Sequence, residues 1–305
     1  MTSPVSYLDG AYLPSSAATI PISSHVVNYG TGCFEGIRAY WNERHEQLYV
    51  TLLRPHAARL VRSARILGLD AEITAEEIEA VVIELLERNE MRQDAYVRPL
   101  VFKSEETIAV KLSGLRTSFA AYCQPMGDYL DISEGLELAY SAWRRIDDNA
   151  VPARAKAIGS YVNAALASDD ARRNGFDEAL MLTGDGHVAE ASSSNVFFVF
   201  DGELHTPQAS DDILVGITRQ AVVELARDLG IVATERRIDK SETFTADEAF
   251  LCGTGVQIAP VTSIDRRPVG TGKPGPLTLR LQETYLAAVR GETPAYEAWR
   301  TPVYR

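Results

Sequence analysis

The stretch "ARAKAIGSYVNAALASDDARRNG", residues 153 to 175, places Lys156 directly before a run of small residues. The run is typical of the start of a helix. The chain otherwise prefers arginine, and its lysines are Lys103, Lys111, Lys156, Lys240 and Lys273. A surface lysine with its stem laid on apolar neighbours is one interpretation of Lys156. The other is a desolvated amine, which loses its proton readily and can attack a carbonyl to form a Schiff base.

Length, composition and charge indicate a globular protein that is large enough for two domains. The chain has 305 residues, of which 46% are hydrophobic and 24% are charged. No run of about 18 apolar residues occurs, so we expect no membrane-spanning helix. The opening stretch "MTSPVSYLDGAYLP" has neither a basic segment nor an apolar core, which favours the cytoplasm over export. A formal net charge of −12 disfavours nucleic acid and membranes as partners, so an anionic ligand requires a local site.

The three cysteines, Cys33, Cys123 and Cys252, are scattered along the chain. Their spacing matches neither a disulfide framework nor a zinc-ligand motif, so we expect reduced thiols and no metal site. The sequence has no internal repeat and no low-complexity tract.

Residues 1–123 alternate strand and helix signals and predict a small α+β domain. "VSYLDGAYLP" has an Asp-Gly turn between two short runs and predicts a hairpin. Helices are expected at "RPHAARLVRSARILGL", which Gly68 closes, and at "TAEEIEAVVIELLERN", which Thr74 and Glu77 open as a capping box. "DAYVRPLVFK" and "SFAAYCQPM" are typical of strands.

Residues 124–134 are the best candidate for a linker, because Pro125 and Gly127 interrupt a strand there. Residues 135–305 predict a larger α+β domain that carries the Lys156 segment. Asp-Gly turns predict two hairpins in it, at "ALMLTGDGHVAEA" and "NVFFVFDGELHTP". A helix at "TRQAVVELARDLG" and a strand at "EAFLCGTG" follow. The fold class is therefore α+β, with two domains joined by a short linker.

Two segments of the second domain could hold an anion. In "LVGITRQAVVELARDLG", Gly216, Ile217 and Thr218 stand at the first turn of an amphipathic helix, where N–H groups and the positive end of the helix dipole meet. An ordinary capped helix is the alternative interpretation. In "LCGTGVQIAPV", the Gly-Thr-Gly turn at residues 253–255 can present N–H groups and a hydroxyl to an anion, although such turns occur in many loops.

A carboxylate accompanies these segments. "HVAEASSSNVFF" places Glu190 before a small-residue turn and an apolar strand, and an acid at a strand end in water is the alternative interpretation. An amine, an anion-binding turn and a carboxylate are what pyridoxal 5′-phosphate requires for its aldehyde, its phosphate and its pyridine nitrogen. These residues together indicate pyridoxal 5′-phosphate as the cofactor.

Seven motifs resemble, in order, those of the branched-chain amino acid aminotransferases, which are fold-type-IV enzymes that use pyridoxal 5′-phosphate. The motifs are "HVVNYGTGCFEGIRAY", "RPHAARL", "YVRPLVF", "KAIGSYVNAALA", "AEASSSNVF", "VGITR" and "LCGTGVQIAPV". The similarity extends from Ser6 to Gly291, which is nearly the whole chain. Seven motifs in one order are far more specific than any one of them.

The resemblance implies a role for each cofactor-binding residue. Lys156 corresponds to the lysine that forms a Schiff base with the cofactor, and Tyr161 to a phenol that hydrogen-bonds the ring oxygen. Glu190 corresponds to the acid on the pyridine nitrogen, and Leu214 to the residue packed on the pyridine face. The implied phosphate ligands are Arg59, Ile217, Thr218 and Thr254.

The resemblance also implies a substrate site. Tyr96 and Arg98 of "YVRPL" correspond to the pair that holds the α-carboxylate, and the amides at Thr254 and Gly255 can bind a carboxylate oxygen. The side-chain pocket is implied to contain Phe34, Met126 and Tyr129. The expected substrates are amino acids and 2-oxo acids.

The resemblance also implies roles for two further residues, one in the assembly of subunits and one in the structure beneath the substrate pocket. Tyr29 of "NYGTG" corresponds to a residue that enters the active site of the neighbouring subunit. A homodimer or a dimer-based oligomer is therefore expected. Arg38 of "FEGIR" is expected to pair structurally beneath the pocket.

The implied activity is transfer of the amino group of leucine, isoleucine and valine to 2-oxoglutarate. Lys156 would remove the α-proton as general base and later return it. Glu190 would keep the pyridine nitrogen protonated, so that the ring can accept the electron pair. The reaction would run as a ping-pong cycle.

Three departures from the family pattern lie around the substrate site. Met126 replaces a common tryptophan, "GTGVQ" replaces an alanine-rich version, and "AVKLSG" replaces a proline-containing loop. Because of these departures, the sequence does not decide whether aromatic substrates or primary amines are also accepted. The alternatives within the fold are an (R)-amine transaminase, a D-amino acid aminotransferase, which "YVRPL" argues against, and an aminodeoxychorismate lyase. A scaffold protein has no reason to keep Lys156, Tyr161 and Glu190 together.

Overall fold

The computed structural model describes residues 4–127 and 134–304, and its contacts divide the chain into two compact units. The first unit comprises Met1–Gly127, Ala155–Gly159 and Ala287–Arg305, and the second comprises the remainder. From the sequence, the Lys156 segment and the C-terminal residues were instead expected in the second domain. The difference arises because the chain returns to the first unit twice after residue 127. Residues 128–133 of the expected linker, Tyr129 among them, lie outside the described residues.

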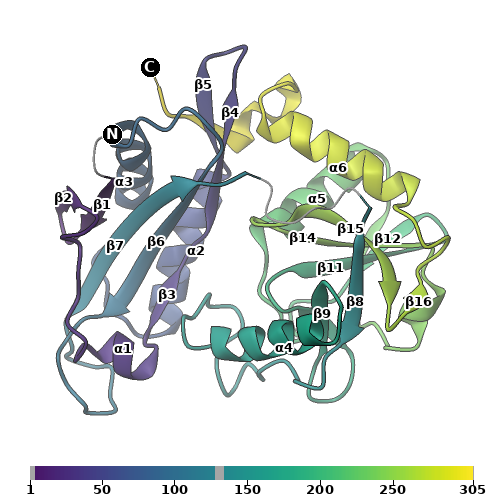
Figure 1. Cartoon of the computed structure of the whole chain (residues 1–305), viewed down its shortest axis with the longest axis horizontal. Helices are drawn as coiled ribbons and strands as arrows, with labels where there is room; N and C mark the ends of the chain where they lie inside the picture. The colour runs from purple at the N-terminus through teal and green to yellow at the C-terminus, as the bar shows by residue number, and fades with distance from the viewer. Residues whose placement is uncertain (1–3, 128–133, 305) are drawn as a thin grey trace. The chain divides into compact units, whose positions relative to one another are not determined.

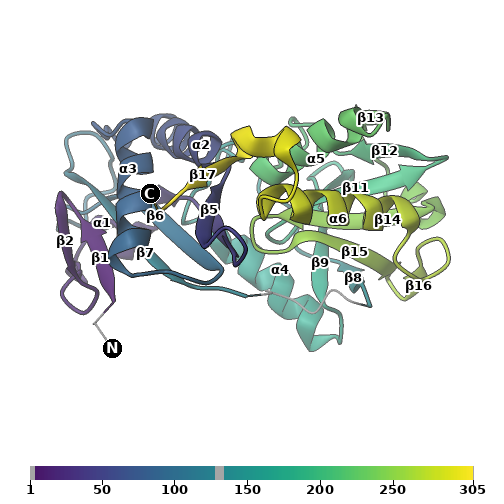
Figure 2. The same cartoon turned by 90° about the horizontal axis from the view of Figure 1, so that it is seen from above.

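The first unit is built on an antiparallel sheet with α2 and α3 on one face (Figures 1 and 2). In the described part of the chain the strand order is β17-β5-β4-β6-β7-β1-β2, and β3 pairs with β6. The bounds are β1 Val5–Leu8, β2 Ala11–Pro14, α1 His25–Tyr29, β3 Gly32–Phe34, β4 Ile37–Asn42, β5 Gln47–Thr51, α2 Leu53–Ile66, α3 Ala75–Arg88, β6 Ala95–Lys103, β7 Thr117–Pro125, η2 Pro294–Trp299 and β17 Arg300–Pro302.

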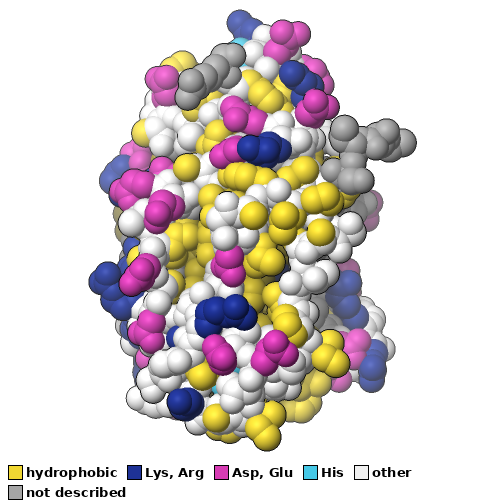
Figure 3. Space-filling model, turned by 90° about the vertical axis from the view of Figure 1, so that its left-hand side faces the viewer, with side chains coloured by type: hydrophobic (Ala, Val, Ile, Leu, Met, Phe, Trp, Pro, Cys, Tyr) yellow, Lys and Arg dark blue, Asp and Glu magenta, His cyan; other side chains and the backbone are white. Residues whose placement is uncertain are grey.

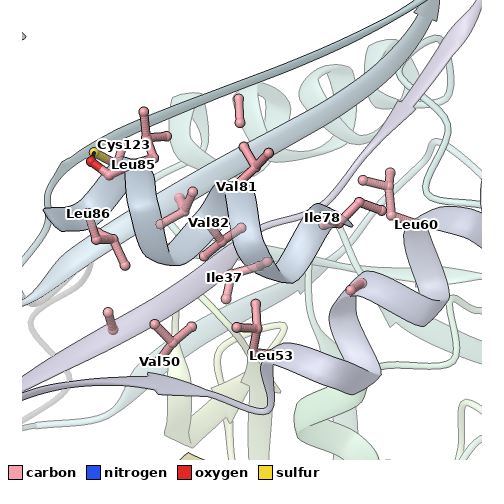
Figure 4. Packing of buried hydrophobic residues seen from close by; sticks show 14 of the residues in the cluster. Ile37, Val50, Leu53, Leu60, Ile78, Val81, Val82, Leu85, Leu86 and Cys123 are labelled. Atoms are coloured by element: carbon pink, nitrogen blue, oxygen red, sulfur yellow. Dashed lines mark hydrogen bonds between the residues drawn. The ribbon is translucent and has the colours of Figure 1, made fainter. Parts of the chain in front are cut away.

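The core of this unit forms where α2 and α3 cover the sheet. Apolar residues recur at helical spacing along α3, and Figure 4 shows them meeting side chains of β4, β5 and α2. The predicted capping box at Thr74 and Glu77 is confirmed at the start of α3. In β6 the residues alternate, so Val97 is buried in this core, whereas Tyr96 and Arg98 are half-buried on the other face of the sheet. The sheet thus stabilises the core with one face and presents the predicted substrate residues on the other.

A groove of about 620 Å³ lies on the first unit, between the β1–β2 hairpin, α3 and β7. Tyr7, Tyr12 and Phe119 line it together with several carboxylates. Figure 3 shows hydrophobic side chains in the middle of the side from which it is drawn, flanked by acidic and basic ones. Among the residues that the structure describes, none of the predicted site residues lines this groove, so it is distinct from the candidate site.

The second unit contains a mixed sheet. Its strand order is β10-β9-β8-β15-β14-β11-β12-β13 over the described residues, and β8 runs parallel to both β9 and β15. The bounds are β8 Leu136–Tyr140, α4 Tyr161–Arg173, β9 Glu178–Leu182, β10 Val188–Ala191, β11 Asn195–Phe200, β12 Glu203–Thr206, α5 Ile217–Asp228, β13 Ala233–Glu235, η1 Glu242–Thr245, β14 Glu248–Gly253, β15 Gln257–Ile264 and β16 Arg267–Pro268. Helix α6, Pro276–Val289, continues from this unit into the first.

The local predictions for hairpins and helices are confirmed. Asp9 and Gly10 join β1 to β2, and Asp201 and Gly202 join β11 to β12, all four with positive φ as such tight turns require. Strands β9 and β10 form the third predicted hairpin. Helices α2, α4 and α5 occur where the sequence predicts them. Helix and sheet in both units confirm the α+β class.

The predicted free thiols are also confirmed. Cys33, Cys123 and Cys252 are buried and unpaired, and burial raises the pKa of each thiol to about 12. Over residues 4–127 and 134–304, no helix is both long enough and apolar enough to cross a membrane.

Candidate active site

The predicted site residues fall into two groups, one in each unit. The first unit holds Tyr29, Phe34, Arg38, Arg59, Tyr96, Arg98, Met126 and Lys156. The second holds Tyr161, Glu190, Leu214, Ile217, Thr218, Thr254 and Gly255. Each group is built differently.

Lys156 lies in a short segment that runs beside β3 and α2. The Phe34 N–H donates to the Lys156 carbonyl at 3.1 Å, and the Ile158 N–H donates to the Gly32 carbonyl at 2.8 Å. The Lys156 N–H donates to Ser63 Oγ of α2 at 3.2 Å. The side chain is half-buried, and its Nζ lies 5.2 Å from the centre of the Phe34 ring. These contacts fix the Lys156 backbone and place its amine beside aromatic surface, not in open water.

Arg59 belongs to a buried cluster that was not identified from the sequence. Its Nε and Nη2 donate to the two oxygens of Glu35 at 2.6 and 2.9 Å, and His56 Nδ1 lies 2.7 Å from Glu35 Oε2. Burial alone would raise the pKa of Glu35, but Arg59 and His56 more than offset it and hold that pKa below its ordinary value. Burial lowers the pKa of His56, which favours a neutral imidazole that donates to Glu35. The cluster thus holds the Arg59 guanidinium on both oxygens of one carboxylate.

Tyr96, Arg98 and Phe34 form a compact group on the face of the first sheet that is opposite the core. Arg98 Nη2 donates to Tyr96 Oη at 2.7 Å, and the guanidinium carbon of Arg98 lies 4.2 Å from the centre of the Phe34 ring. A Cβ at Gly36 would overlap Tyr96 Oη, so the glycine of "FEGIR" is required by this close approach. The planar cation of Arg98 is therefore held in one orientation.

Arg38 and Tyr29 occupy different surroundings. The Arg38 guanidinium is buried and donates to the carbonyls of Met126 and Gly127 at 3.1 and 3.0 Å, so it ties β4 to the segment that carries Met126. Tyr29 ends α1 and is 41% exposed, and its hydroxyl donates to the Ile108 carbonyl at 2.7 Å.

Glu190 is the centre of the second group. It lies in β10 and is only 4% exposed, so the alternative of an acid in water is wrong. Arg145 Nη2 lies 2.7 Å from Oε1, Asn195 Nδ2 donates to Oε2 at 2.9 Å, and the Leu214 N–H lies 3.2 and 3.3 Å from the two oxygens. A buried carboxylate requires such donors.

Arg145 was not identified from the sequence, and Asn195 was given no role there. Asn195 stands inside the motif "AEASSSNVF", so its place in a family motif could have marked it as a candidate site residue. Arg145 follows a strand in "SAWRR", where an arginine gives no sign of the carboxylate it binds. The contacts of both residues with Glu190 can be recognised only in the folded structure.

Helix α5 presents an open N-terminal end. Its N-cap is Gly216, no side chain of the described residues caps it, and its first turn contains no acidic residue. Ile217 and Thr218 are buried at this end. The end therefore combines amide N–H groups and a positive dipole, which suit an anion. Thr254 and Gly255 lie in the turn after β14, and Tyr161 begins α4.

Comparisons with known proteins identify the family of this chain. Residues 32–264 match the family described as "Amino-transferase class IV". A "Probable branched-chain-amino-acid aminotransferase" of Aquifex aeolicus is 43% identical over 299 residues, which are 98% of this chain and 96% of the relative.

Two solved structures are similar over their whole length. The branched-chain aminotransferase of Thermoproteus uzoniensis with norvaline has a TM-score of 0.96 at 43% identity and covers 99% of this chain and 100% of its own. The branched-chain amino acid aminotransferase of Thermobaculum terrenum, in its pyridoxal 5′-phosphate form, has a TM-score of 0.95 at 38% identity, with 99% of both chains covered.

A third solved structure contains a derivative of the cofactor. It is a branched-chain amino acid aminotransferase complexed with N-(5′-phosphopyridoxyl)-L-glutamate, and it has a TM-score of 0.94 at 36% identity, with 100% of both chains covered. The present protein is thus a class IV aminotransferase, a pyridoxal 5′-phosphate enzyme. It belongs to the branched-chain amino acid aminotransferase family.

The Glu35 cluster generates a stability prediction. Glu35→Gln removes the charge that compensates buried Arg59, so we expect the free energy of unfolding to fall by about 3 kcal/mol or more. Urea unfolding followed by circular dichroism measures this loss. Glu79→Gln is the matched control, because Glu79 pairs with the exposed Arg54, and its unfolding midpoint should stay close to that of the unaltered protein. Equal unfolding midpoints for the two variants would contradict the claim that Glu35 compensates the buried charge of Arg59.

Proposed function

We propose that this protein transfers the amino group of leucine, isoleucine and valine, as L-amino acids, to 2-oxoglutarate. The observation that carries the proposal is 43% identity along 98% of the chain with a probable branched-chain-amino-acid aminotransferase. The acceptor is supported by the related enzyme whose complex contains a phosphopyridoxyl derivative of L-glutamate. L-Glutamate is the amino acid that 2-oxoglutarate becomes when it accepts an amino group.

The residues present fit pyridoxal 5′-phosphate. The uncapped N-terminal end of α5 suits a phosphate, and Arg59 and Thr254 add a cation and a hydroxyl. Glu190 is a buried carboxylate, which suits a protonated pyridine nitrogen. Lys156 supplies the amine for the aldehyde.

Two further residues contact the cofactor ring in this proposal. Tyr161 hydrogen-bonds the ring oxygen, and Leu214 packs on the ring face. The Leu214 N–H is directed at Glu190, which supports a position of Leu214 near the ring nitrogen.

The protein's own groups handle the protons. Bound cofactor supplies an electron sink for the pair left at the α-carbon of the donor. Lys156 Nζ removes the α-proton as general base and later returns it as general acid. Glu190 holds a proton on the pyridine nitrogen throughout, which its buried position and fixed donors favour.

Substrate recognition is assigned to the first unit together with the Gly-Thr-Gly turn. Arg98, oriented by Tyr96 and by the Phe34 ring, binds the α-carboxylate. Phe34, Met126 and Tyr129 contact the donor's side chain. Each buried methylene contributes about 0.8 kcal/mol, which favours leucine over alanine. Met126 is flexible, so aromatic side chains also fit the proposal.

A homodimer, or an assembly of dimers, completes the proposal, with Tyr29 entering the partner's site. Support comes from an apolar patch around α1 and the loop 104–112, which are joined by the hydrogen bond from the His25 N–H to the Glu105 carbonyl. The exposed apolar residues of this patch are Ile20, Ile22, Val27, Tyr29, Ile108, Val110 and Leu112. Exposed apolar clusters of this kind are typical of interfaces. Three unpaired thiols suit the reducing cytoplasm, which the proposal keeps as its compartment.

The first prediction from this proposal concerns Lys156. Borohydride reduction of the protein loaded with pyridoxal 5′-phosphate, followed by peptide mapping, should place the pyridoxyl group on Lys156. Lys103 is an internal control, because it is fully buried and its Nζ donates to the Leu69 and Leu115 carbonyls and to Thr117 Oγ1. A pyridoxyl group on any other lysine refutes the role given to Lys156.

The second prediction concerns Arg98. Arg98→Ala should lower kcat/KM for L-leucine by about a hundredfold or more and should affect 3-methylbutylamine, the same donor without its carboxylate, far less. Arg92→Ala is the control, since Arg92 is exposed and stacks on Tyr304. It should change neither value. Equal losses for the two donors would show that Arg98 does not bind the carboxylate.

A further inference from the structure

Asn195 contacts two of the residues proposed to bind the cofactor, Glu190 and Leu214. It is the first residue of β11, is 5% exposed and pairs in register with Cys252 of β14. Its Nδ2 donates to Glu190 Oε2 at 2.9 Å and to the Leu214 carbonyl at 2.9 Å. The Leu214 N–H is in turn directed at Glu190. Asn195, Leu214 and Glu190 therefore form a closed ring of hydrogen bonds.

The other end of the Asn195 amide lies against Gly216, the N-cap of α5. A Cβ at Gly216 would overlap Asn195 Oδ1. The backbone angles of Gly216 are φ −68° and ψ 138°, which any residue adopts. A side chain at position 216 would therefore displace the Asn195 amide from its hydrogen bonds to Glu190 and Leu214, since the start of α5 packs directly on this amide.

The chemistry of asparagine suits these contacts. Its amide has two N–H donors and one carbonyl, and here the donors serve the buried Glu190 carboxylate and the partly buried Leu214 carbonyl while the oxygen faces Gly216. Aspartate has the same shape but lacks the NH₂ group, and it would set a second carboxylate beside Glu190. Leucine has a similar size and donates to neither acceptor, so the Glu190 carboxylate and the Leu214 carbonyl would each lose a hydrogen-bond donor.

We propose that Asn195 is a positioning residue that holds Glu190 and the segment 214–216 in one arrangement. The acid for the pyridine nitrogen and the helix end for the phosphate are thereby set together by one side chain. This inference rests on the proposed function, in which Glu190 serves the pyridine nitrogen and Ile217 and Thr218 serve the phosphate. It goes further by making the two recognition steps depend on a residue that contacts neither part of the cofactor.

The test compares three ligands by titration of the protein's fluorescence. They are pyridoxal 5′-phosphate, its analogue with a C–H group in place of the pyridine nitrogen, and pyridoxal, which lacks the phosphate. The unaltered protein should bind pyridoxal 5′-phosphate more tightly than either analogue. Each preference is the dissociation constant of an analogue divided by that of pyridoxal 5′-phosphate. In Asn195→Leu, both ratios should fall at least tenfold. Asn195→Asp, which keeps the shape, should show the same double loss and serves if the leucine variant does not fold.

Thr206→Val is the matched control. Thr206 is buried in β12, and its Oγ1 donates to the Val196 carbonyl of β11 at 2.8 Å. The substitution removes one buried hydrogen bond beside the same strand but leaves Glu190 and Gly216 without any lost contact. Both preferences should stay within twofold of those of the unaltered protein.

The outcomes separate the inference from the proposed function. Equal weakening of all three ligands in the Asn195 variants would assign Asn195 a general structural role and overturn the inference. Loss of only one preference would overturn the claim that Asn195 sets both the pyridine-nitrogen site and the phosphate site. Unchanged preferences would show that Asn195 positions neither site. If the unaltered protein shows no preference for pyridoxal 5′-phosphate, the proposed function itself fails, whatever the variants do.

Discussion

The buried carboxylate of Glu190 constrains much of the second unit. Removing a carboxylate from water costs several kcal/mol unless donors replace the water. Arg145, Asn195 and the Leu214 N–H supply them from three separate segments of the chain. The segment after β8, the start of β11 and the loop before α5 must therefore meet around one side chain. The same contacts fix the position of the uncapped end of α5, which in the proposed function binds the phosphate.

The first unit satisfies a second buried carboxylate in a related way. Glu35 is enclosed by Arg59 and His56, which come from one helix, α2. The same helix also holds the Lys156 backbone through Ser63. Helix α2 therefore positions a proposed phosphate ligand and the proposed Schiff-base lysine with side chains spaced along one face. Each unit therefore contains a buried carboxylate, Glu35 or Glu190, whose hydrogen bonds fix the proposed site residues around it.

Much of the local structure could be predicted from the sequence, because its causes are local. Asp9-Gly10 and Asp201-Gly202 turns, the Thr74 cap and the apolar spacing in α3 and α5 each act within a few residues. The proposed roles of Lys156 and Glu190 also come from local signals, since the residues that make up their motifs are adjacent in sequence. The family resemblance is confirmed by the full-length comparisons.

The unpredicted features depend on contacts between distant segments. The burial of Glu190 could not be predicted, because nothing near it in the sequence shows that Arg145 Nη2 lies 2.7 Å from its Oε1. The assignment of residues 155–159 to the first unit depends on pairing with β3, more than a hundred residues earlier. Nothing in the sequence around Gly216 shows that a Cβ there would overlap Asn195 Oδ1, because the two residues lie in different segments.

The central claim is that these groups serve transfer from branched-chain L-amino acids. It is tested most directly by the rate of amino transfer to 2-oxoglutarate from L-leucine, D-alanine and (R)-1-phenylethylamine, measured on one preparation loaded with pyridoxal 5′-phosphate. We expect the highest kcat/KM for L-leucine, because only this donor combines an α-carboxylate for Arg98 with a large apolar side chain. A higher value for D-alanine or for (R)-1-phenylethylamine would contradict the claim.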